Sequence, residues 1–280
     1  MFFPHVNRIK IMMVCISIQL SLSLPWPLPA FAVREANTKT GALKERIEFD
    51  VKWTFIPLIT TYMETFKVKD GRGSVFFLLT HQAASNTFWN DRMESVVDPS
   101  TLLPEQMETI IKDKNGKRKE TIIFQRSLGK AMYIKQARRD GTETIESIEI
   151  TSRSMDPLSA FYYMRKRLSP ENPFLELQGI TGSRRFLMSG RVVGEEGIKV
   201  SAGRFKTFRF ECTLKFWKNG SKEDKNEGLE KSRANSFTLW VTKDKNRFPV
   251  KIRYGLALGS LNVVAKSLVS YERKVREVPS

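Results

Sequence analysis

The chain has 280 residues and carries 47 lysines and arginines against 30 aspartates and glutamates, a net charge of +17. Its two cysteines and two histidines are too few for a disulfide framework or for a usual transition-metal site, which gathers three or four such ligands. A basic balance often indicates nucleic acid. The N-terminus instead predicts export, and outside the cytoplasm the abundant polyanions are lipid headgroups and acidic polysaccharides. We therefore expect no nucleic-acid partner, no metal and no cofactor.

Residues 1–32 have the features of a cleaved signal peptide. Arg8 and Lys10 precede an uncharged, largely apolar run at 11–24, and Ala30-Phe31-Ala32 has the small residues that signal peptidase requires. The run is too short to span a membrane comfortably. We expect a periplasmic protein of a Gram-negative bacterium, with no transmembrane segment after cleavage.

Strict alternation of apolar and polar residues predicts β-strands along most of residues 33–280. It is clear at 47–53, where Ile47, Phe49, Val51 and Trp53 share a face, and at 208–216, where Phe208, Phe210, Cys212, Leu214 and Phe216 do. Turn signals at Asp70–Gly73, Asn115-Gly116 and Asp140-Gly141 separate further strands into hairpins. The pattern predicts an all-β, antiparallel protein: one domain with a strongly curved sheet or barrel of roughly a dozen strands.

Two segments share one order of features: strand, aspartate, short polar turn, proline, strand. Asp98 and Asp244 can accept turn N–H groups, and Pro104 and Pro249 start the next strand where no donor is needed. This echo leaves open a sheet of two similar halves. Residues 218–235 are highly charged without an apolar face, and we expect a mobile loop there.

A single amphipathic helix is expected near 156–168. Asp156 suits the N-cap and Pro157 the first helical residue, and an apolar stripe follows at Leu158, Phe161, Tyr162, Arg165 and Leu168. We interpret the segment as a helix packed over the sheet, with Asp156 as its cap. The competing hypothesis is a site formed by Asp156, Ser159 and Tyr163.

Several stretches together resemble an exported bacterial family known as domain of unknown function 3108. They are "IEFDVKWTFIPLI", "DPSTLLPEQM", "MDPLSAFYYMRKRL", "GEEGIKVSAGRFKTFRFE" and "LWVTKDKNRFPVKIRY", in that order over nearly all of 33–280. The resemblance implies an envelope-associated β protein without an established reaction, so it supplies no catalytic residues. The chain departs from the family pattern in the turn after the first strand, where a glycine is usual and "FIPLITTY" stands. The paired turns are also similar in fold style to the half-barrels of periplasmic lipoprotein carriers.

We expect a non-catalytic protein, because His81 is the only candidate base after residue 32 and fits a structural role better. The first hypothesis is a curved sheet that holds a lipid or other amphiphile. The residues expected to line its cavity are Phe49, Trp53, Phe66, Phe161 and Tyr162. The alternative is an interaction or assembly module that docks a basic surface on an anionic envelope polymer or a partner protein. The residues of that surface would be Lys117, Arg118, Lys119, Arg138, Arg139, Arg184 and Arg185.

Overall fold

The computed structural model describes residues 41–70, 73–84, 89–113, 116–136, 141–218 and 234–271. The first eight strands are β1 (Ala42–Trp53), β2 (Ile56–Lys69), β3 (Val75–Ala84), β4 (Trp89–Val97), β5 (Pro104–Asp113), β6 (Gly116–Gln125), β7 (Lys130–Gln136) and β8 (Glu143–Glu149). A short 3-10 helix, η2 (Arg126–Leu128), joins β6 to β7, and helix α2 (Pro157–Arg167) follows β8. The remaining strands are β9 (Phe174–Thr181), β10 (Arg184–Val200), β11 (Gly203–Lys218), β12 (Asn235–Thr242), β13 (Pro249–Gly255) and β14 (Ser260–Ser270).

All of these strands belong to one antiparallel 14-stranded sheet, in the order β8-β7-β6-β5-β4-β3-β2-β1-β14-β13-β12-β11-β10-β9. Strands that are consecutive in sequence are neighbours, except that α2 carries the chain from β8 at one edge to β9 at the other. The first and last strands pair in the interior of the sheet, with Phe49 opposite Ala265. The predicted all-β antiparallel fold is confirmed.

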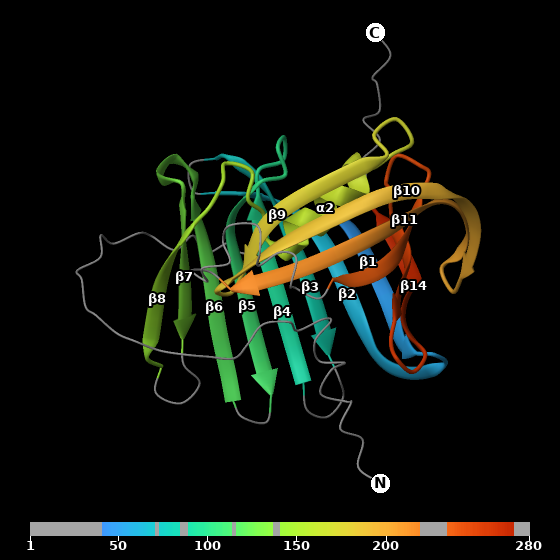
Figure 1. Cartoon of the computed structure of the whole chain (residues 1–280), viewed down its shortest axis with the longest axis horizontal. Coiled ribbons are helices and arrows are strands. Elements are labelled where there is room, and N and C mark those ends of the chain that lie inside the picture. Colours follow the sequence, from blue (N-terminus) through green and yellow to red (C-terminus); the bar gives the residue numbers. More distant parts are fainter. Residues whose placement is uncertain are drawn as a thin grey trace.

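The sheet curves strongly but does not close. Register shifts interrupt the ladders, for example between Val192 and Gly194 on β10 and between Val96 and Val97 on β4, and such bulges bend and twist a strand. As a result, β9, β10 and β11 cross in front of β3–β6, with α2 between the two layers (Figure 1). The concave side of the sheet, which faces α2, is called the inner face below.

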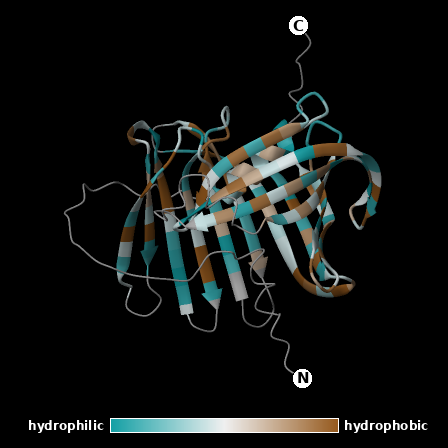
Figure 2. Ribbon diagram, in the orientation of Figure 1, coloured by the Kyte–Doolittle hydropathy of each residue, from teal (hydrophilic) through white to brown (hydrophobic). Residues whose placement is uncertain are grey.

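Apolar residues alternate with hydrophilic ones along the strands (Figure 2). On β11 the predicted apolar face is confirmed: Phe208, Phe210 and Cys212 are buried, and Leu214 and Phe216 pack against them. Cys212 is a free thiol inside this core, and burial raises its pKa to about 12. The thiol is therefore protonated at neutral pH and unreactive.

The two turns that share a sequence pattern also share a geometry. Asp98 Oδ1 accepts the N–H of Ser100 at 2.9 Å, and Asp244 Oδ1 accepts the N–H of Asn246 at 2.8 Å. Each turn then contains a residue with a left-handed backbone, Leu102 at φ 60° and Arg247 at φ 54°. In both strands that follow, the residue after the proline, Glu105 or Val250, is the extra residue of a register shift against the preceding strand. A division into two similar halves stays a prediction.

The other turns agree with the sequence where the structure describes them. Gly73 has a φ of 83°, and Gly116, which begins β6, has a φ of 108°. The expected signal peptide at 1–32 and most of the expected loop, residues 219–233, lie outside the described residues.

Candidate functional site

Helix α2 forms as the sequence predicts, and both parts of its start signal are present. Asp156 Oδ1 accepts the N–H groups of Leu158 and Ser159 at 2.8 and 2.9 Å, and the Ser159 hydroxyl accepts the N–H of Asp156 at 3.1 Å. This reciprocal arrangement is a capping box. The cap assigned to Asp156 is therefore confirmed, and its contacts with Ser159 are those of the box.

The helix lies between two parts of the sheet. Leu158 and Tyr162 pack against β3 and β4, while Ala160, Met164 and Leu168 pack against a core formed by β9–β12. Because strands cover the helix on two sides, more of it is buried than one stripe predicts. Met164 is fully buried, whereas Phe161, expected to be the buried ring, is only partly buried.

Asp156 is fully buried and has a further partner on the sheet. The Ser95 hydroxyl of β4 donates to Asp156 Oδ2 at 2.6 Å, which ties the start of the helix to the inner face. Burial raises the pKa of Asp156 by desolvating the carboxylate, and the hydrogen bonds oppose that shift. The Arg126 guanidinium is a cation near the Asp156 carboxylate. It also donates hydrogen bonds to the carbonyls of Pro104 and Ser154, and these bonds join the start of β5 to the segment before α2.

We expect Asp156→Ala to lower the free energy of unfolding by about 2–3 kcal/mol, because it removes the cap and leaves the Ser95 hydroxyl buried without its acceptor. Asp156→Asn keeps the acceptor for both helix N–H groups and should cost less than about 1 kcal/mol at pH 7. Urea denaturation of the three proteins measures these differences.

A comparison of the wild type with Asp156→Asn also tests whether folding raises the pKa of Asp156. A carboxyl whose pKa is raised on folding stabilises the fold when it is protonated, so its contribution is present at low pH and is lost as the pH rises through the folded pKa. The stability of the wild type relative to Asp156→Asn should therefore increase as the pH falls from 7 toward about 4, the ordinary carboxyl range. A difference that stays constant over this interval would contradict the raised pKa.

A buried ion pair joins the other end of the helix to β1. Arg165 Nη2 lies 2.5 Å from Glu45 Oε1, with the Arg165 side chain fully buried and that of Glu45 11% exposed. The Arg165 guanidinium also lies over the Tyr162 ring, 4.1 Å from its centroid. Within the part of the chain that the structure describes, Arg165 Nε and Nη1 have no hydrogen-bond partner. A buried cation with open donors is unusual, because such groups are normally satisfied.

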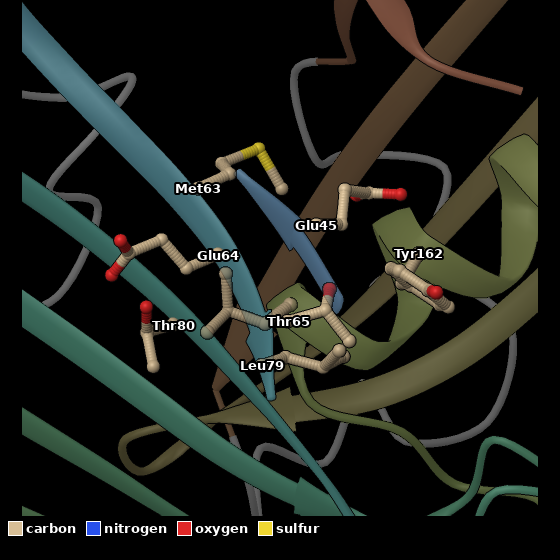
Figure 3. Close-up of a pocket in the computed structure, with 8 residues that line it drawn as sticks. Glu45, Met63, Glu64, Thr65, Leu79, Thr80 and Tyr162 are labelled. Carbon is tan, nitrogen blue, oxygen red and sulfur yellow. The ribbon is translucent and has the colours of Figure 1, made fainter. Parts of the chain in front are cut away.

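A small pocket lies beside this ion pair, between α2 and strands β1–β3 (Figure 3). Its volume is about 10 Å³, room for about one water molecule. It is lined by Glu45, Met63, Glu64, Thr65, Leu79, Thr80, Leu158 and Tyr162. An acyl chain does not fit this pocket unless α2 moves.

Of the five residues expected to line a cavity, only Tyr162 lines this pocket. Phe49 belongs to the core around β13 and β14, and Phe66 packs against a cluster on β2–β4. Trp53 lies at the end of β1, where its Nε1 donates to the carbonyl of Leu258 at 2.9 Å. The five residues are therefore spread over separate clusters. Glu45 and Thr65, which do line the pocket, were not among them.

The residues expected to form a basic surface come from different strands. Lys117 is exposed near the start of β6, and Arg184 and Arg185 are half-buried at the start of β10. Arg118 is not a surface residue, because its side chain points to the inner face and is only 7% exposed. Its Nε lies 2.8 Å from Glu120 Oε1. Lys119 pairs with Glu108 at 2.7 Å. Arg138 and Arg139 lie outside the described residues.

His81 has the structural role that the sequence favours. It is buried on β3, and its Nε2 shares a hydrogen bond with Thr61 Oγ1 at 2.7 Å. Burial lowers its pKa to about 4, so the imidazole is neutral at physiological pH. Over the described ranges, no three His, Cys, Asp or Glu side chains group in a way that could hold a metal ion.

The fold belongs to a class of open, barrel-like sheets. A crystal structure of a β-barrel-like protein of domain of unknown function DUF1849 from Brucella abortus matches it with a TM-score of 0.50 at 8% identity, over 82% of this chain and 99% of that one. A "putative lipoprotein" from Parabacteroides distasonis matches with a TM-score of only 0.28 at 10% identity, over 82% and 95% of the chains. No curated protein matches the sequence.

The chain itself belongs to the family described as protein of unknown function (DUF3108), whose sequence profile matches residues 48–266. The family resemblance of the five quoted stretches is confirmed. Within the described ranges, no helix has the length and apolar character needed to cross a membrane.

Proposed function

We propose that this is a non-catalytic protein of the bacterial cell envelope, exported to the periplasm, that binds an anionic amphiphile on the inner face of its sheet beneath helix α2. The observation that carries the proposal is the Arg165 guanidinium. It is fully buried, has Glu45 as its one carboxylate partner within the described residues, and keeps two nitrogens without hydrogen-bond partners.

Burying a cation costs several kcal/mol unless its partners satisfy it. A carboxylate or phosphate headgroup could accept a charge-assisted hydrogen bond from Arg165 Nε or from Nη1, which point to different edges of the guanidinium. The apolar residues around α2, among them Leu79, Leu158 and Met164, would then contact the hydrocarbon part. Because the pocket holds about 10 Å³, binding would require α2 to move away from β3 and β4.

Mass spectrometry of lipids extracted from natively purified protein tests the proposal, together with melting curves in lysophosphatidic acid and in neutral lysophosphatidylcholine. The anionic lipid should raise the melting temperature more than the neutral one. The double variant Glu45→Gln/Arg165→Gln, which leaves no lone buried charge, should lose this selectivity. Arg167→Gln should keep it, since Arg167 is exposed on the same helix. A lipid-free extract with no shift in melting temperature would refute amphiphile binding.

The interaction module is the second candidate, and exposed cations on the outer face favour it. Arg209 and Arg253 are exposed on β11 and β13. The Lys251 Nζ atom lies over the Trp240 ring, 4.8 Å from its centroid. Surface charge pairing weakens with ionic strength, whereas acyl burial does not. Binding to an anionic polysaccharide that disappears at high salt, without any bound lipid, would favour this candidate.

A further inference from the structure

Two hairpin turns lie side by side at one end of the sheet. The turn between β1 and β2 contacts the turn between β13 and β14, because Trp53 pairs with Leu261 and the Thr54 N–H donates to the Ser260 carbonyl at 2.6 Å. Four large, exposed apolar side chains lie on the two turns and on the adjoining start of β2, and we call them the apolar rim. They are Phe55, Leu258, Ile56 and Leu58, with 80%, 69%, 46% and 41% of their surfaces exposed.

The rim lies in two stretches that carry no charged residue. Residues 53–63 and 254–265 are uncharged in a chain of which 28% is charged. The hydrophobic turn between β1 and β2 is visible at the lower right of Figure 2. Contiguous exposed apolar surface of this kind marks an interaction site rather than ordinary surface.

Basic residues flank the rim on both hairpins. Lys52 precedes the first turn and Arg253 the second, and both pair with Asn262 of β14, so they lie in one row on the outer face. Lys251 lies in the next row, where Val264 separates it from Asp50. An apolar tip bordered by cations matches the two layers of a bilayer surface, hydrocarbon beneath anionic headgroups.

The rim is preformed. Thr54 has a left-handed backbone with φ 56°, and Gly259 in the neighbouring turn has φ 84°. A Cβ at position 259 would lie 2.3 Å from Thr54 Oγ1, so the turns are in close contact. The indole N–H of Trp53 is satisfied by the Leu258 carbonyl, which fixes the second tip beside the first.

We propose that the apolar rim inserts into the interfacial layer of an anionic lipid bilayer, with Lys52 and Arg253 contacting the headgroups. A stable protein partner would need roughly 20–30 residues on each side. The rim offers four protruding side chains, which suit a bilayer because a bilayer needs no complementary groove. This surface function does not depend on whether an amphiphile binds beneath α2.

The test is co-sedimentation of the full chain with vesicles of phosphatidylglycerol and phosphatidylcholine in equal parts, compared with vesicles of phosphatidylcholine alone. Phe55→Ser/Leu258→Ser should lower the partition coefficient about tenfold or more without lowering the melting temperature. Leu128→Ser is the matched control, because Leu128 is 64% exposed in η2, away from the rim, and binding should then change less than about twofold. Every variant keeps the same N-terminal residues, so differences in vesicle binding between the variants come from the substituted positions.

Lys52→Glu/Arg253→Glu should weaken binding to the anionic vesicles and leave binding to phosphatidylcholine unchanged. The proposal is overturned if the rim variant binds as well as the wild type, or if Leu128→Ser loses as much binding. It is also overturned if the wild type does not bind vesicles but forms dimers that Phe55→Ser/Leu258→Ser abolishes, since the rim would then join two copies of the chain.

Discussion

Glu45→Gln is expected to lower the free energy of unfolding by about 3–5 kcal/mol. The substitution keeps the size of the side chain but removes the carboxylate that faces Arg165, whose guanidinium is fully buried beneath α2. Breaking a buried ion pair by removing one partner is costly, because the other charge stays desolvated without compensation. Urea denaturation followed by circular dichroism measures the loss.

The double variant Glu45→Gln/Arg165→Met separates a lost ion pair from general damage to the core. Replacing both charges with neutral groups of similar size should recover most of the stability, as it often does for buried pairs. If the double variant is less stable than Glu45→Gln, then stacking of the Arg165 guanidinium over the Tyr162 ring, rather than the ion pair with Glu45, stabilises the helix.

Gly179→Ala is the second substitution with a large expected effect, about 3 kcal/mol or more. A Cβ at this position of β9 would lie 2.2 Å from the Met155 carbonyl oxygen and 2.3 Å from the Phe186 ring. Met155 exchanges backbone hydrogen bonds with β9, donating to Gln178 and accepting from Ile180 at 3.0 and 2.9 Å. The added methyl group would push the start of α2 away from the sheet.

Gly197→Ala provides the control, because a Cβ there meets nothing within 4 Å. Hydrogen exchange should show lost protection of the α2 amides in Gly179→Ala and unchanged protection in Gly197→Ala. Equal stability of the two variants in urea would show that β9 and the segment before α2 are not held as tightly as the structure indicates.

Most of the fold could be predicted from the sequence because its strands follow one another as hairpins. Alternation at 208–216 and the glycines of the turns are local signals, and in an antiparallel meander local signals also determine the neighbours. Helix α2 was predictable for the same reason, since Asp156 and Pro157 specify its start within two residues. The pairing of β1 with β14 has no local signal and was not predictable.

The site was predicted less well, for physical reasons. Glu45 and Arg165 are 120 positions apart, and only the curvature of the sheet brings them together. In the sequence, the one sign of this ion pair is the position of Arg165, a charged residue inside the apolar stripe of the helix. The inward position of Arg118 has no signal in the sequence, because "KRKE" is charged on both faces of the strand and alternation does not show which side chain points inward.

The central pairing of β1 with β14 also governs how the protein is made. Synthesis delivers β1 first and β14 last, so while β1–β8 emerge, the edge of β1 that will face β14 has no strand to pair with. Such an edge can pair with another chain, and contacts between distant segments form slowly. A nascent chain that lacks β14 is therefore prone to aggregate even when its first eight strands have paired correctly. Folding can be completed only after β14 has been synthesised and can pair with β1.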